Sequence, residues 1–76
     1  MENTEILRLQ EYLRGLFKLP ELSVRRREYK DDSAEVYVGE EFIAVLFRNE
    51  EEGEVSYAFE MAILDIDLPA ARPLSE

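Results

Sequence analysis

The sequence predicts an α+β domain in which one N-terminal helix packs on one face of a four-stranded antiparallel meander (α-β-β-β-β). Residues 4–18 repeat apolar side chains at three- and four-residue spacing, which is typical of an amphipathic helix. Pro20 ends this pattern, and strand-like runs separated by polar or glycine-containing turns follow it as far as Leu68. We expect one domain over residues 1–68 and a flexible C-terminal tail over residues 69–76.

The expected helix begins at Asn3 or Thr4, because either side chain can cap the first turn. Its apolar stripe consists of Ile6, Leu9, Leu13 and Leu16, widened by Tyr12 and Phe17. A single stripe covers a single surface, so the helix is expected to lie on one face of the sheet.

The first strand is expected over residues 22–29, where three consecutive arginines favour a sheet edge, since charges there discourage pairing with other chains. A polar turn over 30–33 leads into the second strand, over 34–38. Gly39 and Glu40 can form a two-residue hairpin turn. The third strand, over 42–48, is apolar on both faces, which indicates an interior position.

Residues 49–53 are expected to form a longer hairpin loop, with the fourth strand running from Glu54 to Ile66. Pairs Phe47–Val55, Val45–Tyr57 and Ile43–Phe59 would place six large side chains on the face that the helix covers. The large side chains change parity at residues 63–64, which predicts a bulge. A short helix over 59–65 is the alternative for this segment.

Composition limits the chemistry that the chain can perform. Its 76 residues include no cysteine and no histidine, so disulfides and Ser/His or Cys/His nucleophiles are impossible and zinc or copper sites improbable. We expect no cofactor. The formal net charge is −9, divided into +2 over residues 1–30 and −11 over residues 31–76. Such an acidic chain is a poor candidate for binding duplex DNA, where phosphate neutralisation supplies much of the affinity.

The N-terminal segment is an unsuitable signal peptide, because Arg8, Glu11 and Arg14 interrupt its apolar residues. No stretch reaches the roughly 20 apolar residues that a transmembrane helix needs. The sequence therefore predicts a cytoplasmic protein without a membrane partner.

Two segments, KDDSAEVYVGEEFIAVLF and MAILDIDL, carry a resemblance to a known family. The chain resembles a small alphaproteobacterial family that is catalogued as a domain of unknown function. The resemblance covers nearly the whole chain, from the helix EYLRGLF to the ending LDIDL. It implies a short stand-alone protein and carries no established activity, so it assigns no catalytic or binding residue.

Two polar pairs are candidate sites. Asp65 and Asp67 would share one face of a strand, as a carboxylate-dependent or Mg²⁺-assisted enzyme fragment requires, although a solvated sheet end explains them more simply. Arg25 and Arg27 would share another face with Tyr29 and could contact RNA or a phosphate. The competing explanation is ion pairing on an edge strand.

Surplus apolar surface is the remaining signal, because one helix covers only one face of a sheet. The candidate interface comprises Tyr37, Phe42, Leu46, Ala58, Ala62 and Leu64. Our leading hypothesis is a non-enzymatic interaction module that docks a protein partner or itself. The fourth strand lacks charge over residues 61–64, so its edge is expected to pair with a second copy in a homodimer.

Overall fold

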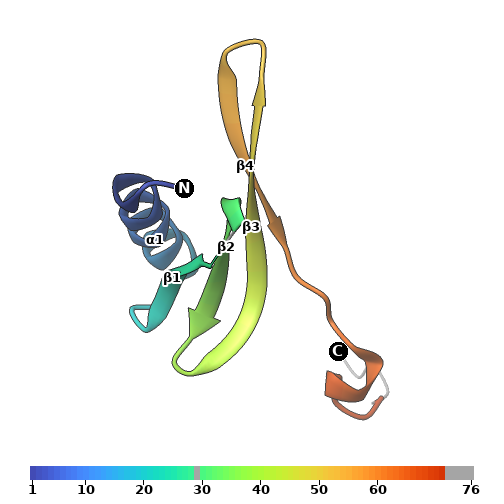
Figure 1. Cartoon of the computed structure of the whole chain (residues 1–76). Helices are drawn as coiled ribbons and strands as arrows, with labels where there is room; N and C mark the ends of the chain where they lie inside the picture. The colour runs from blue at the N-terminus through green and yellow to red at the C-terminus, as the bar shows by residue number, and fades with distance from the viewer. Residues whose placement is uncertain (29, 72–76) are drawn as a thin grey trace.

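The computed structural model describes residues 1–28 and 30–71, and it shows one helix followed by a single four-stranded antiparallel sheet (Figure 1). The elements are α1 (Asn3–Phe17), β1 (Leu22–Arg27), β2 (Lys30–Val38), β3 (Glu41–Glu51), β4 (Glu54–Glu60) and the 3-10 turn η1 (Asp65–Asp67). The strands lie in the order β1-β2-β3-β4, so every neighbour in the sheet is also a neighbour in sequence. The predicted α+β meander is therefore confirmed.

The helix begins one residue earlier than predicted. Glu2, not Asn3 or Thr4, occupies the N-cap position, and its backbone N–H donates to Glu5 Oε1 at 3.1 Å. The acid in the first turn thus satisfies a backbone donor that the helix itself leaves unpaired. At the other end, Lys18 adopts a left-handed conformation (φ 55°) and ends α1 before Pro20.

The first hairpin differs from the prediction in its turn. Residues 30–33 already belong to β2, which starts at Lys30, and the pairing shifts register between Arg26 and Arg27. β1 ends at Arg27, and Tyr29 lies outside the described residues. The predicted turn between β2 and β3 does occur, with Gly39 at φ +60°. That value lies in the left-handed region, which glycine adopts without a steric cost.

The predicted register between β3 and β4 is wrong. The connection is a two-residue turn at Glu52 and Gly53, with φ of 52° and 82°, and not a five-residue loop. It pairs Phe47 with Ala58 and Leu46 with Phe59. The sequence had paired Phe47 with Val55, which lies three positions before the observed partner, Ala58. Because this displacement is odd, the β3 side chains that were predicted to face the helix lie on the opposite face of the sheet. Positive φ at both central residues is typical of a type I′ hairpin turn.

A second irregularity separates Phe42 from Leu46, which the sequence had placed on one face. Val36 pairs with Ala44, but Tyr37 pairs with Phe42, so one extra residue bulges from β3. Phe42 consequently lies with Tyr37 on the outer face of the sheet, away from α1, with ring centroids 5.7 Å apart. Leu46 is 2% exposed and faces the helix.

The hydrophobic core lies between α1 and the first three strands. Its buried apolar members are Met1, Ile6, Leu13, Leu22, Val24, Ala34, Val36, Ala44 and Leu46. The helix lies closest to β1 and bonds to its outer edge: Arg14 Nε donates to Leu22 O at 2.6 Å, and Val24 N–H donates to Gln10 Oε1 at 3.0 Å. Side chains of α1 therefore bond to the outer edge of β1. β4 forms the other edge of the sheet, and none of its residues belongs to the buried core.

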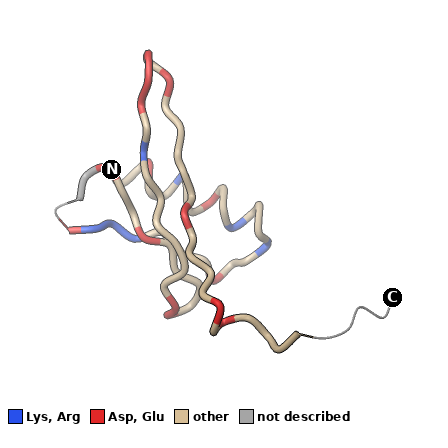
Figure 2. Tube along the Cα trace, turned by 90° about the vertical axis from the view of Figure 1, so that its right-hand side faces the viewer, with Lys and Arg blue, Asp and Glu red and all other residues tan. Residues whose placement is uncertain are grey.

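Acidic residues gather along the β3–β4 hairpin (Figure 2), which projects beyond the helix (Figure 1). The hairpin tip contains Glu50, Glu51, Glu52 and Glu54, all of them exposed. Carboxylates are costly to bury without a partner, so the tip stays in water and adds polar surface.

The C-terminal segment does not continue the sheet. β4 ends at Glu60, so the predicted strand to Ile66, the bulge at residues 63–64 and the short helix over 59–65 are all wrong. Residues 61–64 have no assigned secondary structure, and η1 follows them. We call residues 61–68 the C-terminal arm. It runs away from the helix and the sheet (Figure 1).

Candidate binding groove

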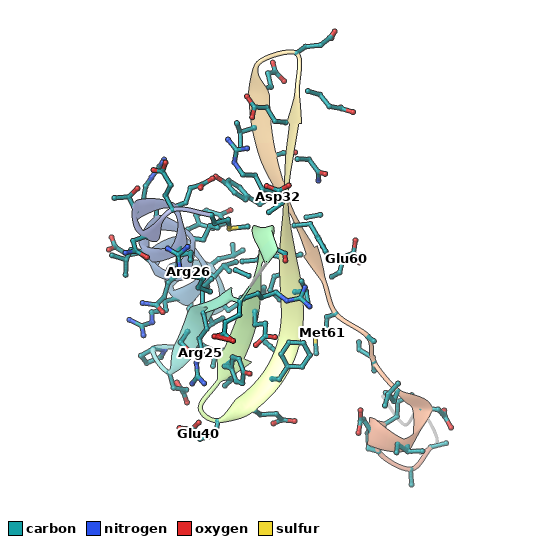
Figure 3. The ribbon with its side chains drawn as sticks, in the orientation of Figure 1. Arg25, Arg26, Asp32, Glu40, Glu60 and Met61 are labelled. Carbon is teal, nitrogen blue, oxygen red and sulfur yellow. The ribbon has the colours of Figure 1, made fainter. Side chains whose placement is uncertain are left out.

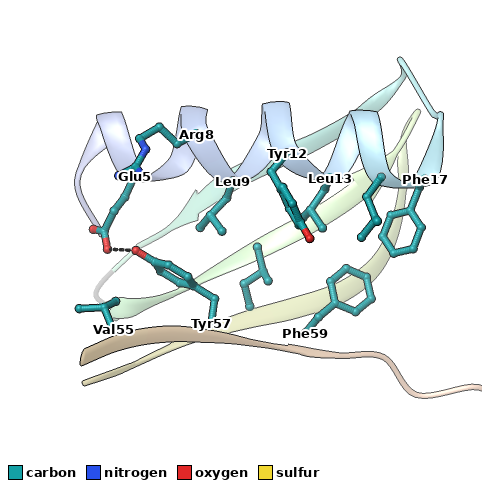
Figure 4. A pocket seen from close by; sticks show the side chains of 11 residues that line it. Glu5, Arg8, Leu9, Tyr12, Leu13, Phe17, Val55, Tyr57 and Phe59 are labelled. Atoms are coloured by element: carbon teal, nitrogen blue, oxygen red, sulfur yellow. Dashed lines mark hydrogen bonds between the residues drawn. The ribbon is translucent and has the colours of Figure 1, made fainter. Parts of the chain in front are cut away.

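An open apolar groove of about 650 Å³ lies between α1 and the helix-facing side of β3 and β4 (Figure 4). It is lined by Glu5, Arg8, Leu9, Tyr12, Leu13, Leu16, Phe17, Leu46, Val55, Tyr57 and Phe59. We call it the α1–β4 groove. It exists because the helix lies over β1 and leaves the outer half of this sheet face uncovered.

Large apolar side chains line the groove without being buried by this chain. Tyr12 is 64% exposed, Leu16 56%, Phe17 46% and Val55 42%. These residues come from both sides, α1 above and β4 below, so a bound chain would lose water from two walls at once. Contiguous exposed apolar surface of this kind marks interaction sites in soluble proteins.

One end of the groove is closed by a polar cluster around Glu5. Its Oε2 accepts a hydrogen bond from Tyr57 OH at 2.6 Å and from Arg48 Nε at 2.8 Å. The Tyr57 hydrogen bond is the main cause that lowers the pKa of Glu5, and the same bond raises the pKa of Tyr57. Glu5 is therefore ionised at neutral pH with both oxygens engaged, which suits the tethering of α1 to β3 and β4 rather than proton transfer.

The other end is closed by an aromatic pair. Phe17 from the last turn of α1 and Phe59 from β4 have ring centroids 5.8 Å apart at an interplanar angle of 52°. Tilted aromatic pairs at this separation are attractive beyond their buried area. Phe59 was predicted on the helix-covered face, and it does lie there, although it pairs with Leu46 and not with Ile43.

Arg8 lies at the rim of the groove (Figure 4). Within residues 1–28 and 30–71, its guanidinium takes part in no hydrogen bond or ion pair. The groove thus combines an apolar lining with one cation that is available to an incoming carboxylate.

A second hollow, of about 520 Å³, lies where the C-terminal arm leaves the sheet. Phe42, Val45 and Phe47 line it from the outer face of β3, and Met61 and Leu64 from the arm. Glu60 and Met61 mark the departure point in Figure 3. This hollow is smaller than the α1–β4 groove and lies on the opposite face of β3.

Of the six candidate interface residues, Leu46 lies apart from the others. Phe42, Ala62 and Leu64 line the second hollow together. Tyr37 is partly exposed beside Phe42, and Ala58 is partly exposed opposite Phe47. Leu46 lies in the core beneath α1, so its predicted place on the outer face is wrong.

Arg25 and Arg27 lie on the outer face, and both are engaged within the chain. Arg25 stacks over the Tyr37 ring at 3.9 Å and lies 3.8 Å from Glu40. Arg27 donates to Ser33 Oγ at 3.2 Å and lies 3.8 Å from Glu35. Tyr29, the proposed stacking partner, lies outside the described residues. These contacts support the ion-pairing explanation for the arginines.

Asp65 and Asp67 belong to η1 and not to a strand. Residues two apart in a 3-10 turn differ in direction by about 120°, so the shared face that a strand would give is absent. In the described part of the chain, no three carboxylates cluster in a way that could hold a metal ion.

Comparison with known protein families gives a match over most of the chain. A family model described as "Protein of unknown function (DUF3126)" matches residues 5–67. The chain belongs to this family. The matched region of the family runs from Glu5, the residue that ties α1 to the sheet, to the end of η1, and so includes the α1–β4 groove and most of the arm. The comparisons find no curated protein and no solved structure that matches the chain.

No helix in the described part of this DUF3126 member is long and apolar enough to cross a membrane. The groove residues were not identified as a site from the sequence. The available signal was the width of the helix stripe, which Tyr12 and Phe17 extend beyond the four aliphatic residues at its centre. The sequence did place Tyr57 and Phe59 on the helix-covered face, but it paired them with Val45 and Ile43, so Leu46 was missed as their neighbour in the groove.

Proposed function

We propose that the protein is a non-enzymatic interaction module whose α1–β4 groove binds a segment of a protein. The observation that carries this proposal is the exposure of Tyr12, Leu16 and Phe17 in a groove whose other wall is also apolar. Hydrophobic grooves are a recurrent way to bind short peptide segments through their apolar side chains.

The polar groups around the groove support binding over catalysis. Glu5 is occupied by Tyr57 and Arg48, and Asp65 and Asp67 are held in a 3-10 turn outside the groove. Acid–base chemistry needs a group within reach of a substrate and free to exchange a proton. An apolar site with one rim cation fits a peptide that carries apolar residues and an acid.

A matched pair of helix variants tests this function. Leu16 and Leu7 are both exposed on α1, at 56% and 60%, but only Leu16 lines the groove. Leu16→Gln should weaken protein association by about tenfold or more, because one leucine side chain is worth about 1.5–3 kcal/mol when buried. Leu7→Gln should change it little.

The measurement combines sedimentation of the purified chain with recovery of proteins bound to a tagged copy at physiological salt. We expect association, with itself or with another protein, that survives Leu7→Gln and is lost in Leu16→Gln. Absence of any protein association, or equal association by all three chains, would contradict the proposed function.

A further inference from the structure

We infer, on the basis of the proposed function, that the α1–β4 groove binds the C-terminal arm of a second copy, in a reciprocal homodimer. The arm is residues 61–68, and the groove is the one closed by the Glu5 cluster and the Phe17–Phe59 pair. Both halves of the contact are exposed in the single chain.

The arm carries apolar side chains that this chain leaves in water. Met61 is 50% exposed, Ile63 66%, Leu64 55%, Ile66 86% and Leu68 54%. Soluble monomers rarely display so many large aliphatic residues in succession. An arm that binds in the groove of another copy would therefore remove apolar side chains of both partners from water.

The arm cannot fill its own groove in the conformation shown. Residues 61–64 continue beyond the Phe59 end of β4 and away from α1 (Figures 1 and 3). The first turn in the arm is η1, by which point the chain has left the sheet (Figure 1). The arm of a second copy can enter the groove without a reversal of its direction relative to its own β4.

Charges on the two partners are complementary. Asp65 and Asp67 alternate with Ile66 and Leu68 in the arm, and no described residue pairs with either carboxylate. Arg8 is the cation at the groove rim. An arm placed with its apolar side chains in the groove can offer a carboxylate to Arg8, and this contact would offset part of the repulsion between two chains of net charge −9.

The chain exposes more surface than a compact monomer of its size. The chain exposes 6406 Å², whereas a compact monomer of 8.9 kDa exposes about 4,800 Å². The projecting acidic hairpin accounts for part of this surplus, and the apolar arm and groove walls supply surface that a second copy can bury. The radius of gyration, 15.2 Å, likewise exceeds the roughly 11 Å of a compact chain of this length.

Reciprocal arm exchange is a closed arrangement with twofold symmetry, in which each copy gives one arm and receives one. It differs from direct pairing of two β4 edges, the arrangement that the sequence suggested. That expectation depended on residues 61–64 being an edge strand, and they lie outside the sheet.

Engineered cysteines in the full chain test the contact directly, because the protein contains none of its own. One chain carries Leu16→Cys in the groove and another carries Ile66→Cys in the arm. Mild oxidation of the mixture should give a disulfide-linked pair of different chains. The control mixture, Leu7→Cys with Ile66→Cys, should give little of it, because Leu7 does not line the groove.

Sedimentation equilibrium of the full chain supplies the energetic test. Wild type should be dimeric at micromolar concentration. Leu16→Gln, and separately Ile63→Gln with Ile66→Gln, should raise the dissociation constant at least about 100-fold, because each contact occurs twice in the dimer. Arg8→Glu should weaken the dimer, and adding Asp65→Lys and Asp67→Lys should restore part of the affinity.

The inference is overturned by a wild type that stays monomeric at high micromolar concentration, or by a dimer without the link between residues 16 and 66 of different chains. If such a monomer still binds another protein through Leu16, the proposed function stands and only the identity of the partner is wrong. If no protein binds the groove, both fail.

Discussion

Tyr57 donates a hydrogen bond of 2.6 Å to Glu5, across a separation of 52 residues in the chain. This bond joins the first turn of α1 to β4, the strand farthest from the helix's main contact with β1. The bond therefore holds the first turn of α1 beside β4 at one end of the groove.

Tyr57→Phe tests this link. The change removes the donor and leaves Glu5 with Arg48, so we expect the free energy of unfolding to fall by about 1 kcal/mol, as for a partly buried hydrogen bond to a charged group. Tyr12→Phe is the control, since Tyr12 is 64% exposed and should change stability by less than about 0.5 kcal/mol. Urea unfolding measures both, and equal effects would show that the link is not formed.

The same pair predicts a pH dependence. The pKa of Glu5 lies below its usual value of 4.5 in the folded chain, mainly because Tyr57 donates to it. Its stabilising contribution is therefore present above pH 4.5 and is lost as the pH falls through the lowered folded value. We expect Glu5→Gln to lose less stability than wild type between neutral pH and acid. Parallel stability curves for the two chains would contradict this assignment.

Two glycine substitutions should have opposite signs. Gly53 has φ +82°, where a side chain is strained, so Gly53→Ala should destabilise the hairpin by about 1 kcal/mol. Gly15 lies in α1 with no atom within 4 Å of an added Cβ, so Gly15→Ala should stabilise the chain by up to about 1 kcal/mol. Thermal unfolding measures both, and destabilisation by Gly15→Ala would mean that α1 packs more tightly than the groove allows.

Arg25 and Arg27 are engaged with Tyr37, Glu35 and Glu40, so they should not serve as an RNA site. We expect no measurable binding of single-stranded RNA at physiological salt, either by wild type or by Arg25→Ala with Arg27→Ala. Micromolar binding that the double variant abolishes, and that falls steeply with added salt, would reverse this prediction.

The sequence predicted the helix, the order of the strands and the turn at Gly39, because each depends on local pattern. It failed at Glu50 and Glu51, which were assigned to a loop by composition but pair as β3 residues. An acidic hairpin tip is solvated in either case, so charge does not distinguish a loop from an exposed strand end. This local error shifted the register of the whole β3–β4 pair by three residues, so Tyr57 and Phe59 were assigned the wrong partners on β3.

The arm was the second failure. Alternating apolar and acidic residues in LDIDL are typical of a strand, but a strand also needs a partner. β3 carries its bulge beside Ala44, one position beyond Val45, where pairing with β4 stops. Because a bulge bends its strand, the end of β3 diverges from the path of the arm. The groove was missed because of the register error, which had put Leu46 on the outer face of the sheet.

The most direct test is an isotope-filtered NMR experiment on an equimolar mixture of labelled and unlabelled full-length chain, which reports only contacts between copies. We predict nuclear Overhauser effects between methyl groups of Ile63 or Ile66 in one copy and the aromatic rings of Tyr12 or Phe17 in the other. They should persist in Leu7→Gln and disappear in Leu16→Gln. Methyl–ring contacts that occur only within one chain, or none at all in a sample at high micromolar concentration, would contradict arm exchange.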